Sequence, residues 1–253
     1  MIKTWITAYD VFSARIAENS GIDTILVGDS LGMTVYGDKD TTQVTKEIML
    51  RHFVAVKKGA PHTRIVLDFP YNSAKNLETA LKTAEYFSHS GANIFKIEGD
   101  ASEKNLEIFS ALIQKGYQIV GHLGLQPQKF LTSDWTVKGR EKSEAENIKN
   151  SVQKFLDIGI TEIVLECVPE ILATEIQKKY SGKADIIGIG AGRGVHAQIL
   201  VFDDVVGRTD SSKFSPKFVQ KFGEAEKTES QAVQDYISFV QTKKFPAEKH
   251  IFR

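Results

Sequence analysis

Short apolar runs alternate with amphipathic stretches along almost the whole chain. The runs are rich in Val, Ile and Leu, as is typical of parallel strands buried on both faces, and they predict eight strands: residues 4–9, 24–29, 64–69, 94–99, 118–123, 162–167, 185–190 and 199–205. Between most of them, apolar residues at helical spacing predict helices at residues 11–19, 46–58, 77–89, 103–115, 143–157 and 169–180. Strict alternation implies parallel strands, and eight of these close most simply into a (β/α)8 TIM barrel. A doubly wound open sheet is the alternative fold.

The whole chain is predicted to form one domain. Its 253 residues match the roughly 250 that are typical of such a barrel, and no linker, repeat or low-complexity tract divides it. Residues 211–253 carry no further strand pattern. We predict a C-terminal helical extension of one or two helices, packed on the outside of the barrel with Tyr236, Ile237 and Val240 on one face.

Composition and charge exclude several classes of function. Lys and Arg together number 32, as do Asp and Glu, so the chain shows no basic surface for nucleic acid or an anionic membrane. No run is long enough to cross a membrane, and the first residues do not resemble a secretion signal, so we expect a cytoplasmic protein. A single cysteine excludes an internal disulfide framework and a cysteine-rich metal cluster.

Four of the apolar runs end in a carboxylate, at Asp29, Asp68, Glu98 and Glu166. The C-terminal ends of barrel strands are where catalytic groups collect. Asp29, Asp68 and Glu98 close three consecutive strands and are expected to converge, and oxygen ligands without His or Cys favour Mg²⁺. The alternative for each carboxylate is a helix cap or an ordinary salt bridge.

Other polar residues are expected around these acids. Lys96 lies two residues before Glu98 and faces the same side, where it can bind an anionic substrate oxygen or form a structural ion pair. Ser30 places a hydroxyl directly after Asp29. Glu166, on the sixth strand, is placed to act as a general base, and His122 is either a hydrogen-bond donor to substrate or a structural core histidine.

Several motifs, in order along nearly the whole chain, resemble ketopantoate hydroxymethyltransferase. The most specific are Gly28–Met33 and Gly121–Gln128. The others are Thr7–Asp10, Lys96–Gly99, Val164–Pro169 and Ile187–Gly192.

The resemblance implies an Mg²⁺-dependent β/α barrel that forms a homo-oligomer, usually a decamer. Its reaction transfers a one-carbon unit from 5,10-methylenetetrahydrofolate to 3-methyl-2-oxobutanoate, giving ketopantoate for pantothenate synthesis. Carried over to this chain, it implies that Asp29, Asp68 and Glu98 hold Mg²⁺ directly or through water, and that Glu166 is the catalytic base. Substrate contacts are then expected from five residues, namely Asp29, Ser30, Asp68, Lys96 and His122. The cation would stabilise the enolate that forms when the base removes the C3 proton.

Two further interpretations are considered. Phosphoenolpyruvate mutase and isocitrate lyase enzymes use a similar Mg²⁺ site to make or break C–C and P–C bonds, but the chain lacks the Lys-Lys-Cys-Gly-His loop of the lyases. A non-catalytic, metabolite-binding relative is the other alternative, and the intact set of acids and Lys96 disfavours it.

Overall fold

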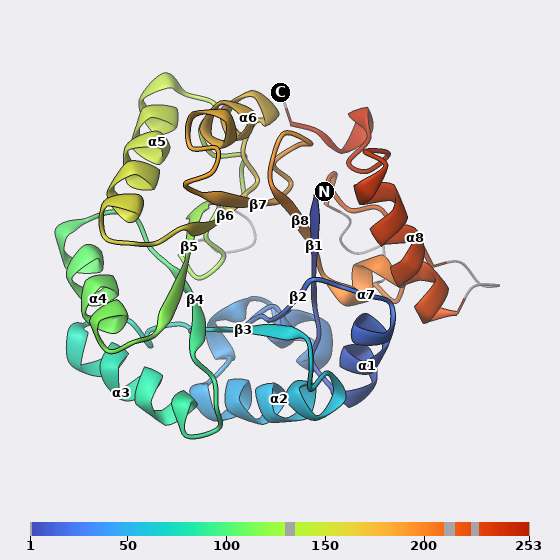
Figure 1. Ribbon diagram of the computed structural model, residues 1–253, viewed down its shortest axis with the longest axis horizontal. Coiled ribbons are helices and arrows are strands. Elements are labelled where there is room, and N and C mark those ends of the chain that lie inside the picture. Colours follow the sequence, from blue (N-terminus) through green and yellow to red (C-terminus); the bar gives the residue numbers. More distant parts are fainter. Residues whose placement is uncertain (1, 130–134, 210–215, 224–227, 253) are drawn as a thin grey trace.

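The computed structural model describes residues 2–129, 135–209, 216–223 and 228–252, and within them eight parallel strands form a closed barrel in the order β1 to β8. The strands occupy the centre of the molecule and the helices surround them (Figure 1). Their bounds are β1 Lys3–Thr7, β2 Thr24–Val27, β3 Arg64–Asp68, β4 Ile94–Glu98, β5 Gln118–Gly124, β6 Glu162–Glu166, β7 Asp185–Ile189 and β8 Ala197–Leu200. Pairing of β1 with β8 closes the barrel, which confirms the predicted fold and excludes the open sheet.

The six predicted helices are all present, each within one residue of its predicted bounds. They are α1 Val11–Asn19, α2 Lys46–Gly59, α3 Leu77–Ser88, α4 Glu103–Gln114, α5 Lys142–Asp157 and α6 Glu170–Lys179. Local capping explains part of this agreement, because the side chains of Asp10, Thr45 and Asn76 accept hydrogen bonds from backbone N–H groups in the first turns of α1, α2 and α3.

The eighth strand was predicted at residues 199–205 and this prediction was wrong at its C-terminal end. The strand stops at Leu200, and Phe202–Val205 form the short helix α7. The apolar run continues past the strand because Phe202 and Val205 are themselves buried in the core. A short apolar run does not distinguish a buried strand from a buried helix.

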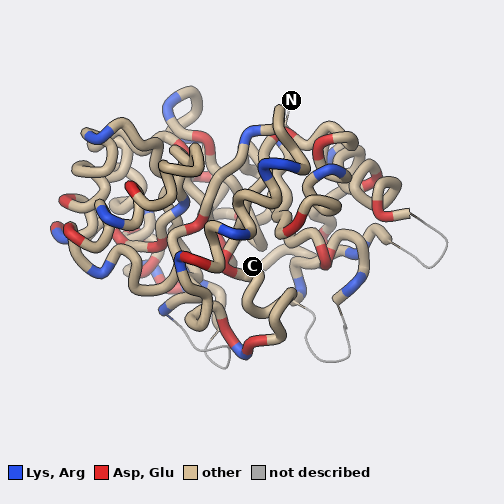
Figure 2. Tube along the Cα trace, turned by 90° about the horizontal axis from the view of Figure 1, so that it is seen from below, with Lys and Arg blue, Asp and Glu red and all other residues tan. Residues whose placement is uncertain are grey.

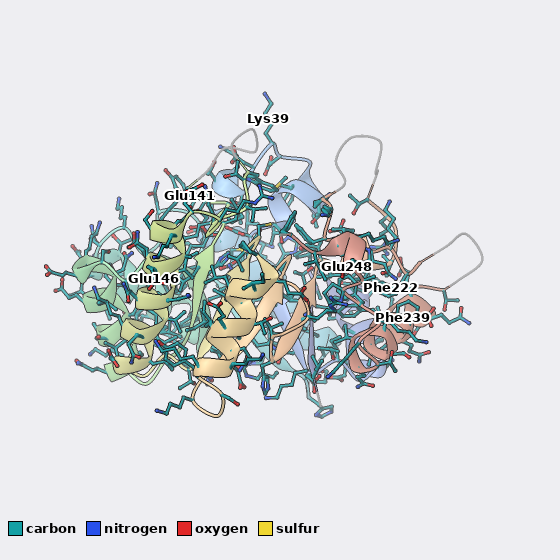
Figure 3. The ribbon with its side chains drawn as sticks, turned by 90° about the horizontal axis from the view of Figure 1, so that it is seen from above. Lys39, Glu141, Glu146, Phe222, Phe239 and Glu248 are labelled. Carbon is teal, nitrogen blue, oxygen red and sulfur yellow. The ribbon has the colours of Figure 1, made fainter. Side chains whose placement is uncertain are left out.

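The C-terminal segment packs against the barrel through helix α8, Glu229–Gln241. The hydroxyl of Tyr236 donates to the carbonyl oxygens of Trp5 in β1 and Gln198 in β8, at 3.0 and 2.9 Å. Phe222 packs edge-on against both Tyr236 and Phe239 of α8, and Figure 3 shows Phe222 close to Phe239. The predicted apolar face is confirmed, since the buried residues of the helix are Ala232, Val233, Tyr236, Ile237 and Val240.

Apolar side chains fill the interior of the barrel on the side away from its mouth. They are Trp5, Leu26, Val66, Val120, Val164, Ile187, Ala197 and Ile199, one or two from most of the strands. A separate and larger core lies between the strands and the surrounding helices. These side chains fill the barrel interior near the N-terminal ends of the strands, and a pocket lies at the mouth, where the strands end.

Charged residues of both signs are interspersed along the chain in Figure 2. This arrangement agrees with the balanced composition of the sequence. None of the helices within the described ranges has the length and apolar character needed to span a membrane.

Candidate active site

Alternate positions on the central strands change from apolar to ionisable toward the mouth of the barrel. Side chains two apart on a strand face the same way, so each ionisable group stands directly above an apolar residue of the barrel interior. The pairs are Val66 with Asp68, Val120 with His122, and Val164 with Glu166, while Ile94 lies below Lys96 and Glu98. The sequence therefore directs these groups into one buried space.

Asp68 and Lys96 form a buried ion pair on adjacent strands. The Nζ atom of Lys96 lies 2.9 Å from Oδ2 of Asp68, and the two side chains are 5% and 1% exposed. Asp29 lies just beyond the end of β2, and its backbone N–H donates to the same Oδ2 atom at 3.3 Å. The structural ion pair considered for Lys96 is thus present, at a position that also opens into the pocket.

Gln128 connects two of the acids, a role that its place in the sequence did not indicate. Its side-chain amide donates to Oδ2 of Asp29 at 2.7 Å and to the carbonyl of Phe69 at 2.8 Å. Its backbone N–H donates to Oε2 of Glu98 at 3.1 Å. Gln128 ends one of the two most specific motifs, but only the folded chain shows that it reaches Asp29, 99 residues away in sequence.

Burial and mutual repulsion control the charges of this group. Burial raises the pKa of Asp29 well above its usual value, and the neighbouring Asp68 raises it further. Burial also raises the pKa of Asp68, although Lys96 offsets part of the effect. Burial disfavours the charge of Lys96, but the surrounding Asp68, Glu98 and Asp29 outweigh burial and raise its pKa.

His122 lies between the two glutamates of the site. Its Nδ1 atom is 3.5 Å from Oε1 of Glu98 and its Nε2 atom is 3.2 Å from Oε2 of Glu166. The Nζ atom of Lys96 lies 3.3 Å from the same Nδ1. Glu166 is therefore close to Glu98 through His122, and stands across the barrel from Asp29, because β6 is opposite β2 in the ring.

The pKa of His122 is raised to about 9 by its neighbours. Burial of the ring and the ammonium group of Lys96 both lower the pKa, but the carboxylates of Glu166 and Glu98 outweigh them. The raised pKa favours the protonated imidazole at neutral pH. His122 is thus a buried histidine that also faces the pocket, so both roles considered for it fit its position.

Ser30 is held in place by Tyr9. The hydroxyls of Ser30 and Tyr9 lie 2.8 Å apart, and Tyr9 is 3% exposed. Burial raises the pKa of Tyr9, so its hydroxyl stays protonated and available as a donor. Tyr9 belongs to the Thr7–Asp10 motif, but sequence reasoning did not assign it to the site.

All of the predicted site residues line one pocket of about 770 Å³ at the mouth of the barrel. They are Asp29, Ser30, Asp68, Lys96, Glu98, His122 and Glu166. Figure 3 shows Lys39 projecting from the connection between β2 and α2, which lies on this side of the barrel. Cys167, which follows Glu166, is buried.

The donor set fits a hard cation that keeps water in its coordination shell. Oδ1 of Asp68 and Oε1 of Glu98 are buried and have no hydrogen-bond partner. In the described part of the chain, no three His, Cys, Asp or Glu side chains gather closely enough to hold a metal ion together. The arrangement therefore fits Mg²⁺ bound by one or two carboxylates, with water and substrate completing the shell, better than a metal enclosed by protein ligands.

A closed parallel barrel with acids, a lysine and a histidine buried at its mouth defines a TIM-barrel enzyme. Residues 2–248 match the family of ketopantoate hydroxymethyltransferase. The chain belongs to this family, and it is a hydroxymethyltransferase.

Named relatives agree with the family. The 3-methyl-2-oxobutanoate hydroxymethyltransferase of Bacillus licheniformis is 40% identical over 251 residues, which cover 98% of this chain and 88% of that protein. The enzyme of the same name from Thermus thermophilus is 41% identical over 250 residues, which cover 98% and 94% of the two chains.

Among solved structures, a phosphonopyruvate hydrolase in complex with oxalate and Mg²⁺ superposes with a TM-score of 0.60 at 12% identity, covering 79% of this chain and 75% of that one. At this identity the likeness shows a shared fold. The mutase and lyase interpretation therefore gains no support beyond the barrel itself.

Proposed function

We propose that this enzyme transfers a hydroxymethyl group from 5,10-methylenetetrahydrofolate to 3-methyl-2-oxobutanoate and forms 2-dehydropantoate (ketopantoate) through an enolate. The observation that carries the proposal is the buried row of Glu98, His122 and Glu166 beside Asp68 and Lys96 in one pocket. This row places a carboxylate base opposite groups that can hold an anionic oxo acid. Relatives about 40% identical that carry the name of this activity support the same conclusion.

The metal proposed for this site is Mg²⁺, with Asp29, Asp68 and Glu98 as direct or water-mediated ligands. Three buried carboxyl groups and the partly buried Glu166 outnumber the two basic side chains, Lys96 and His122, so the pocket is suited to a divalent cation. The phosphonopyruvate hydrolase of the same fold was solved in complex with oxalate and Mg²⁺, which is consistent with this choice. When bound, the cation would supply Lewis-acid stabilisation of the charge that develops on the keto oxygen.

The side chains around the pocket have distinct tasks in the proposed reaction. Lys96 and Ser30 bind the oxygens of the oxo acid, with Tyr9 fixing the Ser30 hydroxyl. Glu166 removes the proton from C3 of the substrate. His122 lies 3.2 Å from Glu166 and 3.5 Å from Glu98, and holds both carboxylates in place.

The base assignment is tested by exchange of the C3 proton of 3-methyl-2-oxobutanoate in D₂O with Mg²⁺, followed by proton NMR without folate. We expect exchange in the wild type and a loss of about 10²–10⁴-fold in Glu166→Gln, the usual contribution of a placed base. The matched control is Glu175→Gln, which changes an exposed glutamate on α6 and should leave exchange unchanged.

Exchange at the wild-type rate in Glu166→Gln would contradict the role of Glu166. Absence of exchange in the wild type, even with tetrahydrofolate added, would contradict the enolate mechanism. Transfer from methylenetetrahydrofolate to the oxo acid, detected as ketopantoate, tests the overall reaction.

A further inference from the structure

The pocket extends well beyond the groups that the oxo acid needs. Its volume of about 770 Å³ lies in the range of roughly 300–1,000 Å³ that accommodates drug-sized ligands. The acids, Lys96 and His122 come from β2 to β6, whereas another part of the lining comes from α7 and the segment after it. Because α7 follows β8, which stands opposite β4 in the ring, this second wall faces Glu98 across the mouth.

This second wall combines apolar surface with one available carboxylate, that of Asp203. Phe202 and Phe218 contribute to the lining, and the Asp203 side chain is 15% exposed. Among the described residues, the side chain of Asp203 contacts the guanidinium of Arg208, with Nη1 3.4 Å from Oδ1. Arg208 lines the same pocket, is half exposed and also pairs with Glu229, so it offsets part of the charge of Asp203.

The other two carboxylates at this wall already have structural roles. Oδ1 of Asp204 accepts from the hydroxyl of Thr209 at 2.6 Å. Asp10 caps α1 and accepts from two backbone N–H groups of its first turn, at 2.7 and 2.8 Å. An ionised carboxylate has about four acceptor sites, and within the described residues the side-chain contact of Asp203 is with Arg208 through Oδ1.

Burial raises the pKa of Asp203, and Arg208 offsets part of this effect. Burial thus leaves the carboxylate with fewer hydrogen bonds to water. A ligand with N–H donors can supply hydrogen bonds in their place.

We propose that Asp203 binds the pterin ring of the folate co-substrate. This proposal rests on the function proposed above. The 2-amino-4-oxopyrimidine part of a pterin presents two N–H donors side by side, which match the two oxygens of a carboxylate in the same paired geometry that a guanidinium uses. The apolar walls of the pocket can cover the faces of the ring. Bound in this way, the folate lies across the mouth from the oxo acid, and its one-carbon unit points toward the acids of β2 to β4.

The first test is Asp203→Asn in the full-length enzyme with Mg²⁺. Asn has the same shape, but its amide presents N–H groups to the N–H donors of the pterin. We expect the Kd of tetrahydrofolate and its KM as methylene donor to rise about 10- to 100-fold, as for loss of a hydrogen-bonded charged partner. C3 proton exchange without folate should stay within about twofold of wild type.

Asp204→Asn is the matched control, since it removes the same charge one residue further along. The Kd of tetrahydrofolate should then change by no more than about twofold. An equal loss in both variants would show that net charge alone is responsible and would overturn the assignment.

A second measurement identifies the part of folate that is bound. A tetrahydropterin without the aminobenzoylglutamate tail is used as competitor against tetrahydrofolate, and its inhibition constant should rise in Asp203→Asn by the same factor as the Kd of the full folate. An unchanged inhibition constant would overturn the contact with the ring. Both constants are measured by binding, so they test the role of Asp203 even if the enzyme fails to exchange the C3 proton. Failure of that exchange would contradict the proposed function and not the role of Asp203.

Discussion

The buried carboxylates at the mouth differ in the groups that balance their charge. Asp68 pairs with Lys96, whereas Glu98 and Glu166 share His122. Asp29 receives a neutral amide hydrogen bond from Gln128, so its charge stays poorly compensated and its pKa is raised by burial and by Asp68. The residue types could be predicted from the ends of the apolar runs. The pairing of these residues could not be predicted, because it depends on which strand ends become neighbours in the folded barrel.

At this scale we predict a specific effect of Tyr9→Phe on binding of the oxo acid. The variant removes the hydroxyl that lies 2.8 Å from Ser30, and KM for 3-methyl-2-oxobutanoate should rise about 2- to 10-fold, the net value of one hydrogen bond. Tyr180→Phe removes a hydroxyl that donates to Gln153 outside the pocket, and it serves as the control with unchanged KM.

Coupling between the two hydroxyls is measured with a double-mutant cycle. Adding Ser30→Ala to Tyr9→Phe should raise KM by less than the product of the two single effects. Fully multiplicative effects would contradict a role of Tyr9 that acts through Ser30.

At the level of elements, the ends of β5 and β6 fix the direction of Glu166. The N–H of Leu125 donates to the carbonyl of Glu166 at 2.8 Å, just after Gly124 takes a left-handed conformation with φ of 89°. Cys167, directly after Glu166, also has a positive φ, of 48°, which is uncommon for a residue with a side chain. The two strands therefore end side by side, in left-handed backbone conformations that the apolar periodicity of the sequence does not predict.

Two glycine substitutions separate backbone strain from steric overlap at this turn. Gly116 and Gly124 have nearly the same φ, 88° and 89°, but a Cβ at Gly116 meets nothing within 4 Å, while a Cβ at Gly124 overlaps the carbonyl oxygen of Glu166. Gly116→Ala should lower the free energy of unfolding by about 1–2 kcal/mol, the cost of the left-handed conformation. Gly124→Ala should cost about 1–3 kcal/mol more because of the overlap.

Urea unfolding of both variants measures the difference, and equal losses would contradict the steric account. Gly124→Ala should also reduce C3 exchange, because the carbonyl that must move belongs to the proposed base.

For the whole molecule, the barrel separates a stabilising end from a reactive end. The interior of the barrel away from the mouth is apolar. Beside it, the guanidinium of Arg64 stacks over the ring of Trp5 and pairs with Glu162. At the mouth, burial raises the pKa of Asp29 and Asp68, so we expect their charged forms to destabilise the fold when no cation is bound.

The homo-oligomer that the family resemblance implies stays a prediction, as does its decameric form. The exposed large apolar side chains of the described residues are Phe12, Val35, Tyr36, Tyr71 and Ile171, and Val35 also lines the pocket.

Binding of Mg²⁺ should therefore stabilise the whole protein. At about 100 times its Kd the ion adds roughly 2.7 kcal/mol, which should raise Tm by about 5–10 °C. Asp29→Asn should abolish most of this shift. It should also raise Tm in the absence of metal, because a raised pKa means that the charged form of Asp29 destabilises the folded state at neutral pH.

Thermal unfolding with Mg²⁺ and with a chelator measures both effects, and Asp157→Asn on α5, far from the pocket, is the control. A full Mg²⁺ shift in Asp29→Asn would contradict its role as a ligand.

The sequence by itself determined the strand and helix order, the barrel, and the residue types at the mouth, because burial on two faces and helical periodicity are local properties of the chain. Only the tertiary structure decided that His122 bridges Glu98 and Glu166, that Gln128 reaches Asp29, and that the eighth strand turns into a helix at Phe202. These features depend on closure of the barrel, which brings together strand ends that are distant in sequence. Hydrophobic patterning specifies which side of a strand is buried. It does not specify which neighbouring side chain at the mouth balances the charge of a buried group.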